Sequence, residues 1–256
     1  MVTATDVKPS ITISGLSKTF SDAETEPVYV LENVDLTIKQ GEFYILLGPS
    51  GCGKSTLLNI LAGFLEKTGG DLIIKGTSEH AEANRGFVFQ SADSALFPWL
   101  TVEENVEFGL KMRKIPPKER KEKAGYYLKL AGLWGHHHKF PSEISGGMKQ
   151  RVQLARVLAN DPDILLMDEP FGALDAMTRR TMQKELIRIW KETNKTVIFV
   201  THDLHEALQL GQHVGIMSVG PSSRITHAYQ VELPYPREVT SPEFNQYYDQ
   251  IQSHFD

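Results

Sequence analysis

The chain has 256 residues, of which 41% are hydrophobic, and its formal net charge is -5. This allows one large packed domain or a domain with a subdomain, and the negative charge does not favour general affinity for nucleic acid. The single cysteine, Cys52, excludes an intrachain disulfide and suits a reducing compartment. Residues 1–10 lack the apolar core of a signal peptide, and no apolar run approaches the ~20 residues that cross a bilayer. We therefore expect a soluble chain whose membrane role would need a partner.

The first strands are predicted from short apolar runs. Residues Ile11–Ile13 alternate like an edge strand, and residues 28–38 predict one or two further strands after a polar loop at 21–27. Residues 42–47 predict a buried strand, and residues 57–62 predict a buried helix. The segment between this strand and this helix is therefore a strand-to-helix turn.

That turn carries the motif G-x-x-x-x-G-K-[S/T]. It consists of Gly48, Pro49, Ser50, Gly51, Cys52, Gly53, Lys54, Ser55 and Thr56. A helix start attracts phosphate through its unpaired N–H groups and its positive dipole, and the glycines let the backbone fold around an anion. Lys54 is suited to the outer phosphates and the Ser55 hydroxyl to Mg²⁺. The sequence predicts nucleotide binding here, and the alternative is a glycine-rich turn with an incidental lysine. Cys52 is either a small residue that fits the loop or an alkylation-sensitive thiol.

The middle of the chain is predicted to be mostly helical. Strands at 71–74 and 86–89 are followed by an N-cap at Thr101 with an acidic first turn. Residues 111–123 are rich in Lys and Arg, and Pro116-Pro117 within them predicts the start of a new helix. This run is either a solvated helix face or a contact for lipid headgroups or a partner. The triplet His136–His138 is predicted to be a loop, because adjacent residues do not converge on one metal ion.

Strands and helices alternate in the remainder of the chain. Strands are predicted at 163–167, 196–200, 214–217 and 225–231, and helices at 147–160, 176–193, 204–210 and 242–255. This alternation favours a largely parallel core sheet, to which residues 1–90 and 161–256 are assigned. Residues 91–160 are predicted to form a helical subdomain inserted into that core.

Polar side chains follow three of the predicted strands. Asp168 ends a buried strand, where a carboxylate facing a P-loop is placed to hold Mg²⁺, and Glu169 beside it is predicted to polarise an attacking water. The alternative is a turn-forming acid pair. His202 follows the next buried strand and is suited to the γ-phosphate, although a lone histidine is often structural. Gln90 follows strand 86–89, where its amide could reach Mg²⁺ or the water, or could be an ordinary loop amide.

A second helix start also suits an anion. Ser145 precedes Gly146 and Gly147 at the start of helix 147–160, so the serine can cap the helix while the glycines expose N–H groups. The alternative is a simple N-cap. Because the P-loop already serves a nucleotide, a second phosphate cradle suggests a composite site between two subunits.

Together these residues resemble the ATPase subunit of an ATP-binding cassette (ABC) transporter, over about residues 11–231. The matching segments are Walker A at Gly48–Thr56, the Q-loop at Gln90, the signature at Ile144–Arg151, Walker B at Ile164–Asp168 with Glu169, the D-loop at Ala173–Asp175 and the switch histidine His202. The resemblance implies a P-loop NTPase core with a mostly parallel sheet, an antiparallel β subdomain and an inserted α-helical subdomain. It implies ATP and Mg²⁺ as cofactors and a head-to-tail dimer with a second copy or a homologous subunit. Phe20 is similar to the family's adenine-stacking aromatic, and the alternative is an ordinary strand aromatic.

The signature departs from the commonest Leu-Ser-Gly-Gly-Gln at Ile144 and Met148. Met148 is similar to the nitrate, sulfonate, taurine and bicarbonate importer group, as are the segments 96–102 and 171–179. The resemblance therefore implies a peripheral subunit at the cytoplasmic face of the cell membrane. It would power uptake of a small anionic or organic solute through a separate permease and, indirectly, a solute-binding protein. Related importers take up pyrimidine precursors or other small organic acids.

Two other classes remain open from the sequence. One is a soluble ABC ATPase with a non-transport task, and the other is a P-loop small-molecule kinase. The second anion cradle and Glu169 weigh against the kinase, which needs an acceptor pocket instead.

Overall fold

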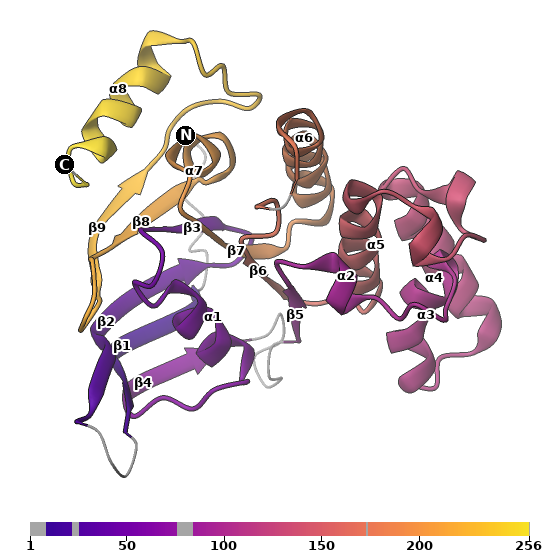
Figure 1. Ribbon diagram of the computed structural model, residues 1–256, viewed down its shortest axis with the longest axis horizontal. Coiled ribbons are helices and arrows are strands. Elements are labelled where there is room, and N and C mark those ends of the chain that lie inside the picture. Colours follow the sequence, from indigo (N-terminus) through magenta and orange to yellow (C-terminus); the bar gives the residue numbers. More distant parts are fainter. Residues whose placement is uncertain (1–8, 22–25, 76–83, 173, 256) are drawn as a thin grey trace, which may run out of the picture. The chain divides into compact units, whose positions relative to one another are not determined.

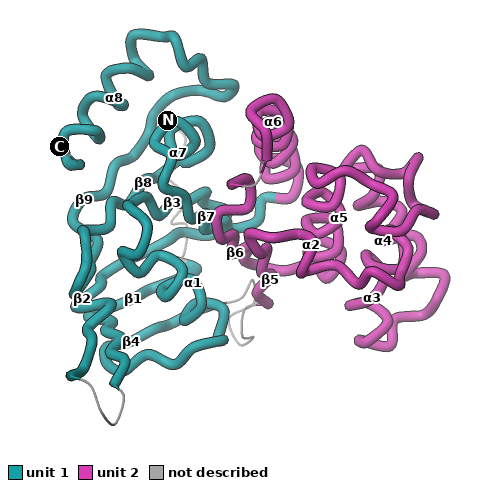
Figure 2. Tube along the Cα trace, in the orientation of Figure 1, with its two compact units in different colours: residues 1–83, 194–256 teal, residues 84–193 magenta. Residues whose placement is uncertain are grey.

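The computed structural model describes residues 9–21, 26–75, 84–172 and 174–255. The chain divides into two units, residues 1–83 with 194–256 (unit 1) and residues 84–193 (unit 2), which Figure 2 colours teal and magenta. Among the described residues, no helix has both the length and the apolar character that a membrane span requires.

Unit 1 holds the phosphate-binding turn and most of the strands (Figure 1). Its elements are β1 (Pro9–Phe20), β2 (Val28–Lys39), β3 (Phe43–Leu47), α1 (Lys54–Ala62), β4 (Gly69–Ile74), β7 (Thr196–Thr201), α7 (Leu204–Leu210), β8 (His213–Met217), β9 (Ile225–Gln230) and α8 (Pro242–Gln252).

The strands of unit 1 are arranged in two ways. β3 lies between β7 and β8 and is parallel to both, while β9 adds antiparallel to β8. Every residue of β3 and of β7 is buried, as expected for parallel strands covered on both faces. β2, β1 and β4 form a separate antiparallel sheet. The predicted parallel core and antiparallel β sheet are therefore both present.

The position of β1 in its sheet contradicts one prediction. The alternation at Ile11–Ile13 suggested an edge strand, but β1 lies in the middle of its sheet. Ile11 pairs with Ile38 on one side and with Ile74 on the other. Alternation reports which face of a strand is buried, and it carries no information about a second partner far along the chain.

Unit 2 contains the predicted helical stretch and two strands. Its elements are β5 (Arg85–Val88), α2 (Ala92–Ala95), α3 (Val102–Met112), α4 (Pro117–Leu130), the 3₁₀ turns η1 (Trp134–His136) and η2 (Pro141–Glu143), α5 (Gly146–Ala159), β6 (Ile164–Asp168) and α6 (Ala176–Thr193). β5 and β6 are parallel. Buried apolar side chains from Leu96 to Ala159 pack into one cluster around α3, α4 and α5. A cluster of this kind gives the stretch a core of its own, although its exact subdomain boundaries remain a prediction.

Two local features of unit 2 follow from its sequence. The Thr101 hydroxyl accepts from the Glu104 amide at 3.2 Å, and Glu104 Oε2 accepts from the Thr101 amide at 2.8 Å, which confirms the N-cap. The Glu104 carboxylate accepts hydrogen bonds from the Thr101 amide and, at 2.9 Å, from the Thr101 hydroxyl, and these two bonds hold the pKa of Glu104 below its usual value. α4 begins at Pro117, as the proline pair predicted. In the basic run, Lys123 pairs with Glu119 at 3.0 Å with both side chains exposed, as on a solvated face.

Candidate functional site

The phosphate-binding turn follows β3 and ends at α1. Gly51 and Gly53 have φ of +82° and +89°, a left-handed conformation that side chains with a Cβ rarely adopt. A Cβ on Gly48 would lie 2.9 Å from Cys52 Sγ, so the loop has no room for one. The predicted strand–turn–helix context is confirmed.

The turn carries the positive charge of Lys54, and no carboxylate among the described residues forms an ion pair with it. The Lys54 side chain is buried, and its ammonium donates to the carbonyls of Gly48 at 2.7 Å and Pro49 at 2.8 Å. No side chain caps the start of α1, and the first N–H groups of a helix have no partner within the helix itself. A buried ammonium beside uncapped N–H groups suits an anion of high charge, so this turn fits the phosphates of ATP.

Cys52 is buried beside Lys54, and burial raises the pKa of its thiol. A thiol whose pKa is raised is a poor nucleophile at neutral pH. The structure therefore favours the interpretation that Cys52 is a small residue that fits the loop. Ser55, by contrast, is exposed at the first turn of α1.

His202 lies at the same sheet edge as the P-loop. Leu47 pairs with Thr201 in parallel register, so Gly48 and His202, the next residues of β3 and β7, leave the sheet side by side. His202 is exposed. Phe20 ends β1, where 44% of its surface is exposed and the Lys18 ammonium lies 4.8 Å from its ring centroid. An exposed ring on this strand is available for stacking.

Unit 2 carries the other predicted site residues. Val88 pairs with Met167 in parallel register, so Gln90 and the Asp168–Glu169 pair leave β5 and β6 at one edge. Gln90 Nε2 and Glu169 Oε2 both approach Gly172, at 3.6 and 3.9 Å from the position that a Cβ there would take. The structure thus brings the amide and the predicted base to one place within unit 2.

Glu169 has a left-handed backbone, with φ of +40°. A non-glycine residue in this region is strained, and such strain gathers at functional sites. The turn is closed by the Gly172 amide, which donates to the Glu169 carbonyl at 3.1 Å. In the adjoining D-loop, Ala173 lies outside the described residues, and Asp175 caps α6 by accepting from the Thr178 amide at 3.0 Å.

The second helix start that suits an anion is the N-terminus of α5. Ser145 is the N-cap, and its hydroxyl accepts from the Met148 amide at 3.4 Å. Ser145 and Gly146 are exposed, whereas a Cβ on the buried Gly147 would collide with Thr178 Cγ2. The helix start therefore presents N–H groups on the surface, and Gly147 permits the close approach of α6.

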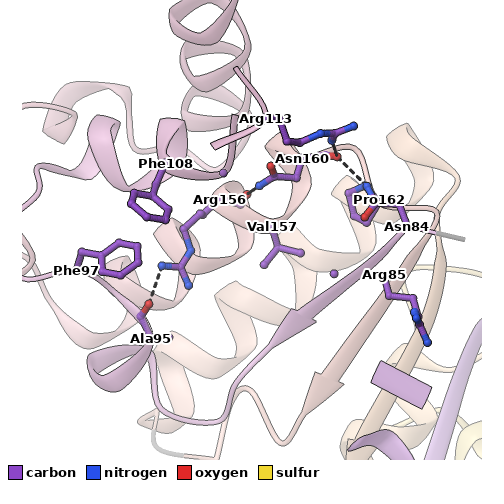
Figure 3. Close-up of a pocket in the computed structure, with 12 residues that line it drawn as sticks. Asn84, Arg85, Ala95, Phe97, Phe108, Arg113, Arg156, Val157, Asn160 and Pro162 are labelled. Atoms are coloured by element: carbon purple, nitrogen blue, oxygen red, sulfur yellow. Dashed lines mark hydrogen bonds between the residues drawn. The ribbon is translucent and has the colours of Figure 1, made fainter. Parts of the chain in front are cut away.

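The P-loop and His202 belong to unit 1, and the carboxylates, Gln90 and the second cradle belong to unit 2. The sequence motifs found all of these residues. They missed Arg156, which lines a cavity of unit 2 (Figure 3). The only signal was one arginine in the apolar run Leu154–Leu158.

A P-loop on a largely parallel sheet, an antiparallel sheet and a second helix start suited to phosphate define an ATP-binding cassette. The chain belongs to the ABC transporter family, to which residues 31–172 match. Members of this family are ATPases coupled to transport, and this chain is an enzyme of that class.

Three similar proteins place the chain within the family. It is 48% identical to the taurine import ATP-binding protein TauB of Pelagibacter ubique, over 86% of this chain and 82% of the relative. It is 44% identical to the aliphatic sulfonates import ATP-binding protein SsuB of Bacillus cereus, over 96% of both chains. Its fold is similar to the cassette MJ0796 in a dimeric post-hydrolysis state bound to ADP and Pi, with a TM-score of 0.73, 34% identity and coverage of 88% of this chain and 100% of that one.

Proposed function

We propose that this chain is the ATP-hydrolysing subunit of an importer and works at the cytoplasmic face of the cell membrane through a separate permease. The observation that carries this proposal is the pair of phosphate-suited helix starts, α1 with Lys54 and α5 with Ser145 and Gly146. One nucleotide needs one P-loop. The second helix start is explained if two copies close head to tail, so that each α5 completes the other copy's site.

Each residue has a role within such a site. The P-loop amides and Lys54 hold the phosphates, Phe20 stacks on the adenine, and His202 bonds the γ-phosphate. Mg²⁺ would be held by Ser55, Asp168 and Gln90, and when bound it neutralises phosphate charge. Glu169 orients and polarises the attacking water, and Gln90 beside it senses whether the γ-phosphate is present.

The solute class follows from similarity and not from the site, because an ATPase subunit does not touch the solute. The relatives named for taurine and aliphatic sulfonates support a small anionic or organic solute. A pyrimidine precursor is the alternative, and a solute-binding protein would act only through the permease.

The permease contact is assigned to the run Phe97–Leu100. Trp99 is 71% exposed and its ring lies 5.6 Å from that of Phe97, so Trp99 is not a core residue. Helix-in-groove docking needs such apolar anchors, and interface hot spots favour tryptophan. A short cytoplasmic helix of the permease is the proposed occupant.

The test is co-purification of the full chain from its native membrane, followed by identification of its companions and measurement of ATP turnover. The expected companions are permease subunits and a second ATPase subunit. If only soluble proteins accompany an active ATPase, the chain is instead a non-transport ABC ATPase.

A further inference from the structure

The turn that carries His202 is closed by three hydrogen bonds that the sequence motifs did not predict. It joins β7 to α7, and both elements belong to unit 1 (Figure 1). The Thr201 hydroxyl donates to Glu206 Oε2 at 2.6 Å and accepts from the Asp203 amide at 3.0 Å. Asp203 Oδ1 accepts from the Glu206 amide at 3.1 Å. Thr201, Asp203 and Glu206 therefore form a closed ring of hydrogen bonds, and His202 lies between two of its members.

This ring differs from an ordinary capping box. In a capping box, the acidic side chain three residues after the N-cap accepts directly from the N-cap amide. Asp203 is the N-cap of α7, and Glu206 is the residue three positions further on. Here the Thr201 hydroxyl stands between the Glu206 carboxylate and the Asp203 amide. Because Thr201 is the last residue of β7, the ring ties the start of α7 to the end of that strand.

The Glu206 carboxylate determines how the Thr201 hydroxyl is oriented. Thr201 is 2% exposed and Glu206 is 6% exposed, so water has little access to either side chain. An ionised carboxylate only accepts hydrogen bonds, and a hydroxyl has a single hydrogen to donate. The distance of 2.6 Å lies in the range of a charge-assisted O–H···O⁻ bond. The hydrogen therefore points to Glu206, which leaves the hydroxyl oxygen to accept from the Asp203 amide.

The backbone of His202 is held on both sides, although its side chain is exposed. On the N-terminal side, Thr201 pairs with Leu47 in the parallel sheet. On the C-terminal side, the Asp203 amide is bound by the ring. The placement of the imidazole therefore depends on the ring. A displacement of about 1 Å in a group that contacts a reacting phosphate can cost about 100-fold in rate.

We propose that Thr201 and Glu206 are positioning residues that hold the His202 imidazole at the γ-phosphate. Thr201 supplies the hydroxyl that fixes the backbone next to His202, and Glu206 orients that hydroxyl. Neither side chain contacts the nucleotide, so both act through His202. The inference rests on the proposed function, which gives His202 its contact with the γ-phosphate.

The test is a double-mutant cycle of Thr201→Val and His202→Ala in the full chain, with ATP turnover as the readout. Valine has the shape of threonine without the hydroxyl, so Thr201→Val opens the ring. We expect kcat to fall by about 10- to 100-fold, while the affinity for ADP, which has no γ-phosphate, stays unchanged. Because Thr201 acts through His202, Thr201→Val should lower kcat no further in the His202→Ala chain. Thr201→Ser keeps the hydroxyl and should keep the turnover.

Glu206→Gln provides a second, milder break in the same ring. Glutamine has nearly the shape of glutamate, but its amide can also donate to the hydroxyl, so the hydroxyl is no longer held in one orientation. We expect kcat to fall, but by less than in Thr201→Val, and again with no further loss in the His202→Ala chain. If Thr201→Val does not fold, Glu206→Gln takes its place in the cycle.

The matched control is Thr196→Val, because Thr196 is the first residue of the same strand. It is 1% exposed, and its hydroxyl accepts from the Gly41 amide at 3.0 Å. The substitution therefore removes the same kind of buried hydrogen bond at the end of β7 that is distant from His202. Both Thr196→Val and Thr201→Val should lower the thermal midpoint, but only Thr201→Val should lower kcat.

Three results would overturn the inference. If His202→Ala hydrolyses ATP as fast as the unaltered chain, the proposed role of His202 fails and the inference fails with it. If His202→Ala loses turnover but Thr201→Val keeps it, or if the two losses multiply in the double variant, the inference fails while the role of His202 stands. If Thr196→Val loses as much turnover as Thr201→Val, the loss reflects stability, and Thr201 is a structural residue only.

Discussion

The stability that the isolated chain loses in Trp99→Ala distinguishes a docking residue from a core residue. With 71% of its surface exposed, Trp99 keeps about 29% covered, or roughly 70 Å² of a side chain of about 250 Å². At ~25 cal/mol per Å², removing that contact costs the isolated chain at most about 2 kcal/mol. A tryptophan in a packed core would cost about 3–5 kcal/mol. We therefore expect a thermal midpoint lowered by no more than roughly 4–8 °C, with basal ATP turnover unchanged.

The same substitution should weaken permease binding by more than about 1 kcal/mol, or roughly fivefold in affinity. The assay measures thermal midpoint, basal turnover and permease retention on one preparation. Tyr126→Ala is the matched control, because Tyr126 is 56% exposed on α4 and does not line the cavity. Unfolding of Trp99→Ala would make Trp99 a core residue after all. A stable variant that binds the permease as tightly as the unaltered chain would refute docking at this residue.

Three further predictions concern the nucleotide. Glu169→Gln keeps the shape of the side chain and loses the base, so MgATP should still bind while turnover falls by about 10²–10⁴-fold; near-normal turnover would remove Glu169 from the chemistry. Phe20→Ala should cost about 1–3 kcal/mol of nucleotide affinity and leave the rate at saturating ATP intact, and an unchanged KM for ATP would make Phe20 a packing residue. Ser145→Arg should abolish the ATP-driven dimer seen by size-exclusion chromatography while the monomer still binds ATP. A mixture of the Ser145→Arg and Lys54→Ala chains should form dimers with one intact site, because both changes fall in the other site. ATP-driven dimerisation of Ser145→Arg alone would exclude the composite site.

Elements with complete local signals were predicted most accurately. Residues 176–193 and 204–210 were predicted as helices with the bounds that α6 and α7 have. Asp203 and Asp175 each accept a hydrogen bond from the first turn of the helix that follows, and this capping is a property of a few neighbouring residues. The place of β1 was missed, because its second partner β4 begins at Gly69, far along the chain.

The site residues, too, could be predicted where the signal is local in the sequence, and not where it depends on distant segments. The end of a predicted strand located each of Gln90, Asp168 and His202, because residues that follow a parallel strand lie at the carboxyl end where ligands bind. The approach of Gln90 and Glu169 to Gly172 required the structure. Arg156 was missed because the sequence shows its charge but not the cavity that it lines, which depends on how α2, α3 and α5 pack.

The left-handed backbone of Glu169 sets its proposed catalytic role against thermostability. At φ of +40° a glutamate is strained, whereas asparagine adopts this conformation at little cost. Asparagine places its amide closer to the backbone and has no carboxylate, so it would stabilise the turn and remove the proposed base. Laboratory evolution for heat resistance alone would therefore drift toward inactive sequences at position 169, and a screen must retain a selection for ATP turnover to keep the glutamate.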